Sequence, residues 1–328
     1  MTGKVLPSVS SVAPTLSVIV PTYRNGPYIY DHLVKLDHTL ASIGEPYEII
    51  AVSDGNDDNT RDELRRFDAP HVRFYHYARN MGKGFALRYG VTRSHGQVVT
   101  FIDGDGDIDP EQIVAYLRIM RETNADVVIG SKRHPDSDVV YPPLRWLYSA
   151  AYQTLLRVFF RLQVRDTQVG LKLFRREVLA AVLPRIVVKR YAFDLELLVV
   201  ASHLGFSRIV EAPVRIGQRL SSTINRNAIA SILIETAAIF YRKNVLRYYD
   251  RPHSVVTLDS LAIIADEELS AMDDERKIIG NVVRWLARPA IVSLRNLVFV
   301  PRTSLYSNPT VEAHGDGVDV EEPWRASG

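Results

Sequence analysis

FIDGDGDIDP, residues 101–110, places aspartates on alternate positions directly after an apolar run. Such a run is typical of a buried strand, and open α/β sheets bind their ligands at the carboxyl ends of strands. Carboxylates held close together repel one another, so they need either full solvation or a cation between them. Hard oxygen ligands suit Mg²⁺ or Mn²⁺, and the stretch therefore predicts a metal-binding loop at the edge of a sheet. The acidic residues are Asp103, Asp105, Asp107 and Asp109.

Two other structures place aspartates at this spacing. A calcium loop of the EF-hand type also begins with acids at its first, third and fifth positions, but it needs glycine at position six and glutamate at position twelve. This chain has Ile108 and Val114 there, which excludes the calcium loop. A solvated acidic turn stays open as the alternative to a metal site.

Strand, loop and helix alternate through the first half of the chain, which is typical of a doubly wound α/β fold with a Rossmann-like nucleotide-binding half. The helix after the acidic stretch is expected to have Asp109 as its N-cap and Pro110 at its first helical position. Expected strands cover residues 16–20, 47–52, 72–77, 98–102, 126–130 and 208–216. Expected helices cover residues 28–40, 61–66, 85–94, 142–160, 191–204 and 228–249.

The chain is expected to form one large domain with flanking segments. Residues 15–250 form the α/β domain, residues 1–14 a disordered leader and residues 311–328 a disordered tail. Between them, residues 251–310 are expected to be a helical extension that serves at a membrane surface or in dimerisation. Its apolar part, residues 282–300, is interrupted by arginines, which favours an interfacial helix over a membrane span. We expect neither a transmembrane helix nor a signal peptide.

Charge and cysteine content narrow the function classes. The 328 residues include 40 Lys and Arg against 38 Asp and Glu, a balance that implies no nucleic-acid partner. Between residues 142 and 247, however, 17 basic residues face 6 acidic ones, which suits a phosphorylated substrate or an anionic membrane surface. The chain has no cysteine, so a disulfide framework, a thiol nucleophile and a thiolate metal site are excluded. A cytoplasmic location agrees with this composition.

Six loop sequences, taken in their order, resemble glycosyltransferase family 2, whose members are inverting enzymes with the GT-A fold. The resemblance covers residues 16–249 and is closest to the branch that places a hexose on a polyprenyl phosphate, which contains the dolichyl-phosphate β-glucosyltransferases and mannose synthases. The stretch YAFDLELL (191–198) is similar to the glucosyltransferases. The six sequences are PTYRN (21–25), VSDGNDDNT (52–60), NMGKG (80–84), FIDGDGD (101–107), GSKR (130–133) and DTQVGLKLFRRE (166–177).

The resemblance implies that a nucleotide sugar binds in the loops that follow the strands. Asn25 and Ser53 stand where many relatives carry an acid, so the donor stays open between UDP-glucose and GDP-mannose. Asp54 has an alternative role as a turn residue next to Gly55. The donor-binding residues expected on this basis are Pro21, Tyr23, Asn25, Asp54, Asn80, Lys83, Asp103 and Arg219.

The metal site also follows from the resemblance. Asp103 and Asp105 match the D-x-D element of the family, in which Mg²⁺ or Mn²⁺ bridges the donor phosphates, and Asp107 is expected as a further ligand. The expected catalytic residues are Asp103, Asp105, Arg145 and Asp194.

The acceptor decides which other residues are needed. A polyprenyl phosphate already carries the negative charge that attacks the sugar, so it needs cations and no general base. A hydroxyl acceptor needs a base, for which Asp194 or Glu196 is the candidate. These two acids lie about 200° apart on a helix and cannot face one site; a structural pairing with Lys172 or Arg190 is the alternative. The expected acceptor-phosphate residues are Lys132, Arg133, Arg145 and Ser149, with Asp166 and Gln168 at the border of the sugar pocket.

These observations together predict a metal-dependent hexosyltransferase at the cytoplasmic face of a membrane. Its substrates are expected to be a nucleotide sugar and a polyprenyl phosphate, and a homodimer or a membrane-protein partner is compatible with the sequence. One alternative is a glycosyltransferase that acts on a hydroxyl of a glycan or small molecule. Another is a protein that binds a nucleotide sugar without catalysis.

Overall fold

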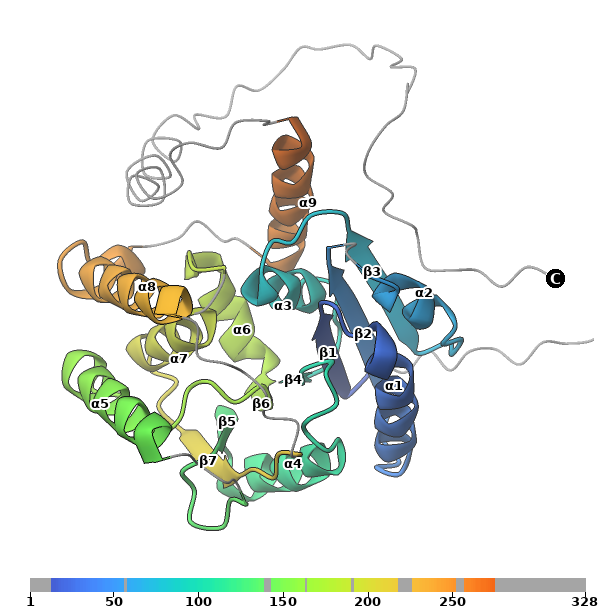
Figure 1. Cartoon of the computed structure of the whole chain (residues 1–328), viewed down its shortest axis with the longest axis horizontal. Helices are drawn as coiled ribbons and strands as arrows, with labels where there is room; N and C mark the ends of the chain where they lie inside the picture. The colour runs from blue at the N-terminus through green and yellow to red at the C-terminus, as the bar shows by residue number, and fades with distance from the viewer. Residues whose placement is uncertain are drawn as a thin grey trace, which may run out of the picture.

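Figure 1 shows the computed structural model of the chain, with helices arranged around a central sheet. The structure describes residues 13–55, 58–138, 143–162, 164–189, 192–217, 226–251 and 257–274, and of residues 143–150, 226–229 and 270–274 only the backbone. Apart from residues 13 and 14, the expected leader lies outside the described residues, as do the segment 282–300 and the tail 311–328.

The described strands form one mixed sheet. They are β1 (Leu16–Thr22), β2 (Tyr47–Asp54), β3 (Val72–Tyr77), β4 (Val98–Phe101), β5 (Val127–Ser131), β6 (Lys172–Arg175) and β7 (Ile209–Pro213). Their order across the sheet is β3-β2-β1-β4-β6-β5-β7, and only β6 runs antiparallel to its neighbours. Ile19 of β1 pairs with Ile50 of β2 and Phe101 of β4, so these strands end at the same edge. This arrangement confirms the mixed, doubly wound α/β fold expected from the sequence.

Helices cover both faces of the sheet (Figure 1). They are α1 (Gly26–Ala41), α2 (Thr60–Arg65), α3 (Lys83–Val91), α4 (Glu111–Thr123), α5 (Pro143–Phe160), α6 (Arg176–Val182), α7 (Phe193–His203), α8 (Arg226–Asn244) and α9 (Leu258–Asp274). One apolar core packs beneath α1, α2 and α4, and a larger one includes side chains of α3 and of α5 to α9. Val18 and Val20 belong to the first core and Ile19 to the second, because successive side chains of a strand point to opposite faces.

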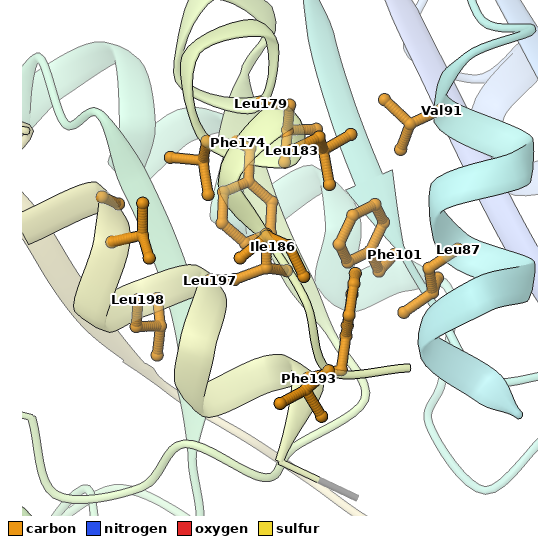
Figure 2. Packing of buried hydrophobic residues seen from close by; sticks show 14 of the residues in the cluster. Leu87, Val91, Phe101, Phe174, Leu179, Leu183, Ile186, Phe193, Leu197 and Leu198 are labelled. Atoms are coloured by element: carbon orange, nitrogen blue, oxygen red, sulfur yellow. The ribbon is translucent and has the colours of Figure 1, made fainter. Parts of the chain in front are cut away.

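The larger core brings the starts of α3 and α7 together (Figure 2). The rings of Phe101 and Phe174 lie with centroids 5.1 Å apart, and Phe193, the first residue of α7, packs in the same cluster. Gly84 in the first turn of α3 leaves no room for a side chain, since a Cβ there would lie 2.5 Å from Cγ of Phe193. This close contact places Lys83, the first residue of α3, near the first turn of α7.

The observed elements differ from the sequence expectation in a few places. β6 and α6 were not expected; β6 is a strand of four residues that owes its conformation to pairing with β4 and β5. α4 begins at Glu111, one residue later than expected, and Asp109 Oδ1 accepts the hydrogen bond of the Glu111 N–H at 3.0 Å. The last expected helix of the α/β domain ends at Asn244, because Arg247 adopts a left-handed conformation with φ of 46°.

α9 belongs to the region expected to form a separate extension, and it packs directly on the α/β domain. Leu261 and Leu269 are buried in the larger core. Asp266 pairs with Arg93, beyond the end of α3, at 2.6 Å, and Glu268 pairs with Lys189 at 2.5 Å. Within the part of the chain that the structure describes, neither α9 nor any other helix is long and apolar enough to cross a membrane.

His32 of α1 lies behind the acidic stretch and makes the stability of the fold depend on pH. The side chain is buried, and its Nε2 has no hydrogen-bond partner among the described residues. Burial lowers the pKa of the imidazole from 6.5 to about 4, although the charge of Asp103 acts in the opposite direction. The unfolded chain therefore binds more protons than the folded one between these values, and stability falls as the pH drops through that window.

The wild-type protein should lose stability between pH 7 and pH 4.5. In His32→Leu we expect this loss in the free energy of unfolding to be about 2–3 kcal/mol smaller, because no imidazole remains to bind a proton. Urea unfolding at the two pH values measures this difference. His38→Leu is the matched control, because His38 is exposed on the same helix and should leave the pH dependence unchanged. Equal losses in the wild type and in His32→Leu would contradict the assignment.

Candidate active site

A cavity of about 520 Å³ opens at the edge of the sheet where β1, β2 and β4 end. Its lining comes from the loops after β1 to β4, from the segment before β6 and from the start of α7. The lining residues are Pro21, Thr22, Tyr23, Asn25, Asp54, Asn80, Gly82, Lys83, Asp103, Gly104, Asp105, Gln168 and Asp194. The structure thus brings together seven of the eight residues expected to bind the donor.

Asp103 and Asp105 form the acidic centre of this cavity. Lys83 Nζ lies 2.5 Å from Asp103 Oδ1. Burial alone would raise the pKa of Asp103, but the charge and hydrogen bond of Lys83, together with the charges of Lys172 and Lys132, hold this pKa below its usual range. Burial, followed by the negative charge of Asp103, raises the pKa of Asp105. When both carboxylates are ionised, their two negative charges exceed the single positive charge of Lys83.

This pair suits a divalent cation. Gly170 leaves space for the carboxylate of Asp103, since a Cβ at position 170 would lie 2.1 Å from Asp103 Oδ2. Asp107 does not line the cavity; its backbone N–H donates to Asp105 Oδ1 at 3.1 Å. Among the described residues, no three His, Asp or Glu side chains stand close enough to enclose a metal ion. Mg²⁺ is usually held by one or two carboxylates together with substrate phosphates and water, and Asp103 and Asp105 supply that number.

Asp54, expected to contact the nucleotide, organises the loop that carries Lys83. Its Oδ1 accepts a hydrogen bond from the N–H of Met81 at 2.6 Å, and its Oδ2 accepts one from the N–H of Gly82 at 2.9 Å. Gly82 has a φ of 96°, which favours glycine. Both carboxylate oxygens of Asp54 are thus engaged by a loop distant in sequence, and the residue also lines the cavity.

Asp194 faces the cavity, whereas Glu196 is buried away from it. Lys172 Nζ lies 2.8 Å from Asp194 Oδ1, and the lysine side chain is only 1% exposed. Glu196 accepts hydrogen bonds from Arg242 at 2.9 Å and from the hydroxyl of Tyr249. The helical spacing predicted that these two acids face different surroundings, and the structure confirms it.

Of the cations expected at the acceptor phosphate, Lys132 and Arg133 have described side chains. Lys132 and Arg133 follow β5, and neither lines the cavity, although the charge of Lys132 contributes to the low pKa of Asp103. The side chains of Arg145 and Ser149 on α5 lie outside the described residues, as does Arg219.

Sequence reasoning missed several glycines and one threonine of the site. A Cβ at Gly104 would lie 2.7 Å from Cγ2 of Thr22, so this glycine lets the loops after β4 and β1 touch. Gly170 likewise leaves the space that the carboxylate of Asp103 occupies. Single glycines beside polar residues are the available signal, but the close approach that requires them exists only in the folded chain.

The sequence is similar to known proteins of one family. The model of the family described as "Glycosyl transferase family 2" matches residues 17–183. The dolichyl-phosphate beta-glucosyltransferase ALG5A of Trichomonas vaginalis is 30% identical over 251 residues, which are 73% of this chain and 77% of that protein. The dolichyl-phosphate beta-glucosyltransferase of Drosophila melanogaster is 34% identical over 209 residues, which are 58% of this chain and 63% of the fly protein.

Solved structures share the fold at low sequence identity. Mannosyl-3-phosphoglycerate synthase from Rubrobacter xylanophilus superimposes with a TM-score of 0.56 at 16% identity, covering 74% of this chain and 77% of that one. Glucosyl-3-phosphoglycerate synthase from Mycobacterium tuberculosis in complex with UDP gives a TM-score of 0.52 at 18% identity, covering 74% and 82%. These likenesses support the fold and say nothing of the substrate.

We expect Lys172→Met to lower the free energy of unfolding by about 3–5 kcal/mol, because it leaves the carboxylate of Asp194 without its buried partner. Lys35→Met is the control, since Lys35 pairs with Asp109 at 2.8 Å but is 53% exposed, and such a pair contributes below about 1 kcal/mol. Urea unfolding of the two variants at pH 7 gives the comparison. Similar losses in the free energy of unfolding in both variants would show that the buried pair contributes no more to stability than the exposed pair.

Proposed function

Since the chain belongs to glycosyl transferase family 2 and is a glycosyltransferase, we propose that it moves glucose, with inversion, from UDP-glucose to a polyprenyl phosphate of the dolichyl type. The observation that carries this proposal is the likeness to the dolichyl-phosphate beta-glucosyltransferases over most of the chain. A cavity that combines a carboxylate pair with Lys83 is chemically suited to a nucleoside diphosphate.

We propose that Asp103 and Asp105 hold Mg²⁺ or Mn²⁺ during the reaction. The ion supplies electrostatic stabilisation of the nucleoside diphosphate as it leaves the sugar. Lys83 lies on the same side of the cavity and adds a positive charge. The N-terminus of α3 begins at this lysine and adds backbone N–H groups that attract phosphate.

The surroundings of Asp194 favour a phosphate acceptor over a hydroxyl. Apart from Asp103 and Asp105, the acids that line the cavity in the described part of the chain are Asp54 and Asp194. The backbone of the Lys83 loop engages Asp54, and the ammonium of Lys172 engages Asp194. Neither is therefore placed as a free base, which a hydroxyl acceptor needs and a phosphate does not. Lys132, Arg133, Arg145 and Ser149 are proposed to hold the acceptor phosphate.

The rival proposals differ in the product that they predict. A glycosyltransferase that acts on a hydroxyl would yield a simple glycoside and would lose turnover in Asp194→Asn. A binding protein without catalysis would take up UDP-glucose and metal and would show neither transfer nor slow hydrolysis of the donor. GDP-mannose is the rival donor, because Asn25 and Ser53 leave the base contacts open.

A transfer assay tests the proposal directly. Purified protein, Mn²⁺ and a short-chain polyprenyl phosphate are incubated with labelled UDP-glucose, UDP-galactose or GDP-mannose, and the lipid extract is treated with mild acid. We expect an acid-labile glucolipid from UDP-glucose and a loss of at least about 100-fold in kcat for Asp103→Asn, which keeps the shape and removes the charge. An acid-stable product would move the acceptor to a hydroxyl, and lipid formed only from GDP-mannose would change the donor.

We further propose that the enzyme sits at the cytoplasmic face of a membrane through the outer side of α5 and α8. The two helices contact each other, since the rings of Phe159 and Phe240 lie 5.0 Å apart and the hydroxyl oxygens of Tyr152 and Thr236 lie 2.9 Å apart. Large apolar side chains nevertheless remain exposed along them, with basic residues on the same elements. This α5–α8 surface comprises Val158, Phe159, Leu233, Ile234, Tyr241 and Val245, with Arg157, Arg161 and Lys243.

Charge and spacing support a lipid surface. Ile234, Tyr241 and Val245 follow one another at intervals of about two turns and one turn, so they form a single stripe on α8. Burial, and after it the positive charge of Arg161, lowers the pKa of Lys243. These two cations therefore lie near each other at the junction of the helices. An apolar stripe beside cations is suited to anionic lipid headgroups.

We expect Ile234→Ser to reduce binding to vesicles that contain phosphatidylserine by roughly tenfold, because one large apolar side chain no longer enters the bilayer surface. Flotation of the protein with vesicles measures the bound fraction. Ile263→Ser on α9 is the matched control, with 61% exposure against 55% for Ile234. Equal effects of the two changes, or strong binding to purely zwitterionic vesicles, would argue against this surface.

A further inference from the structure

The ammonium of Lys83 contacts the carboxylate of Asp103, which is one of the two proposed to hold the cation. Its Nζ lies 2.5 Å from Oδ1, whereas Oδ2 is the oxygen nearer to Gly170. The carboxylate therefore turns one oxygen toward the backbone of the segment before β6 and the other toward the lysine. An ammonium and a divalent cation on the same carboxylate repel each other, so the two compete for Asp103.

The surroundings of Lys83 also offer its side chain a second place. Burial would lower the pKa of Lys83, but the charges of Asp103 and then Asp194 outweigh it and raise this pKa above its usual range. Asp194 lines the same cavity as Lys83 and is paired with Lys172 at 2.8 Å. The backbone of Lys83 is fixed at the start of α3 by the contact of Gly84 with Phe193, whereas its four-carbon side chain can turn.

We propose that Lys83 is a built-in competitor of the divalent cation, which makes metal binding depend on the donor. Without a donor, the ammonium of Lys83 neutralises Asp103 and weakens the site for metal. A bound nucleoside diphosphate gives the ammonium a new partner beside Asp194 and frees Asp103. The inference rests on the proposed metal and donor, and it adds a coupling between them: each increases the affinity for the other.

The decisive measurement is the affinity for Mn²⁺ in the absence of any nucleotide, followed by the electron paramagnetic resonance signal of free Mn²⁺. We expect Lys83→Met to bind Mn²⁺ about tenfold more tightly than the wild type, within the range usual for coupled sites. In a second titration, UDP should raise the Mn²⁺ affinity of the wild type more than that of Lys83→Met. Free Mn²⁺–UDP complex is subtracted with a protein-free titration.

Three further variants separate this effect from a general change of charge or a loss of fold. Lys35→Met removes a lysine that pairs with Asp109 of the same acidic stretch and should leave Mn²⁺ affinity within about twofold of the wild type. Lys83→Arg keeps the charge and should show no gain. Lys83→Gln repeats the neutral change if the methionine variant unfolds, as judged by circular dichroism.

The outcomes distinguish the inference from the function on which it rests. Equal or weaker donor-free Mn²⁺ binding in both neutral Lys83 variants would overturn the competition, whatever the transfer assay shows. A gain of Mn²⁺ affinity of the same size in Lys35→Met would show that any loss of positive charge strengthens metal binding. That result would overturn the competition as well. If the wild type bound no Mn²⁺ even with UDP, the metal requirement of the proposed function would fail, and this inference would fail with it.

Discussion

Repulsion between carboxylates that meet at one edge of the sheet is the constraint on which this site depends. Asp54, Asp103, Asp105 and Asp194 reach the same cavity from β2, from the loop after β4 and from α7. Backbone N–H groups hold Asp54, Lys83 pairs with Asp103 and Lys172 pairs with Asp194, whereas Asp105 accepts the backbone N–H of Asp107. The charge left on Asp105 is what makes the cavity suited to a cation.

Close packing beneath the cavity holds these charges in place. A Cβ at Gly90 would lie 2.5 Å from Cγ2 of Ile19, and one at Gly84 would touch Phe193, so α3 can sit against both β1 and α7 only with glycine at these positions. α7 in turn carries Asp194 at the cavity and Glu196 in the buried network with Arg242 of α8. One helix therefore joins the acidic cavity to α8.

Much of the fold was predictable from local pattern, and the exceptions have a common cause. The strand at Val72–Tyr77 agrees to the residue, because its valine and aromatic residues favour a strand, which is a local property. β6 carries a buried lysine and is held by neighbours distant in sequence, so no local pattern reveals it. α9 lies in the region expected to be helical, but its packing on the α/β domain was not predicted, because its acidic residues pair with Arg93 and Lys189, which are distant in sequence.

The sequence by itself determined the residue types of the site, their order and the loops that carry them, since parallel strands must deliver their following loops to one edge. It also placed Asp194 and Glu196 on opposite sides of a helix, because helical spacing is local. Only the tertiary structure decided which charges meet. That Lys83 faces Asp103, that Lys172 is buried against Asp194 and that Asp54 serves the loop of Met81 and Gly82 depend on distances between segments far apart in the chain, which the packing of the two cores sets.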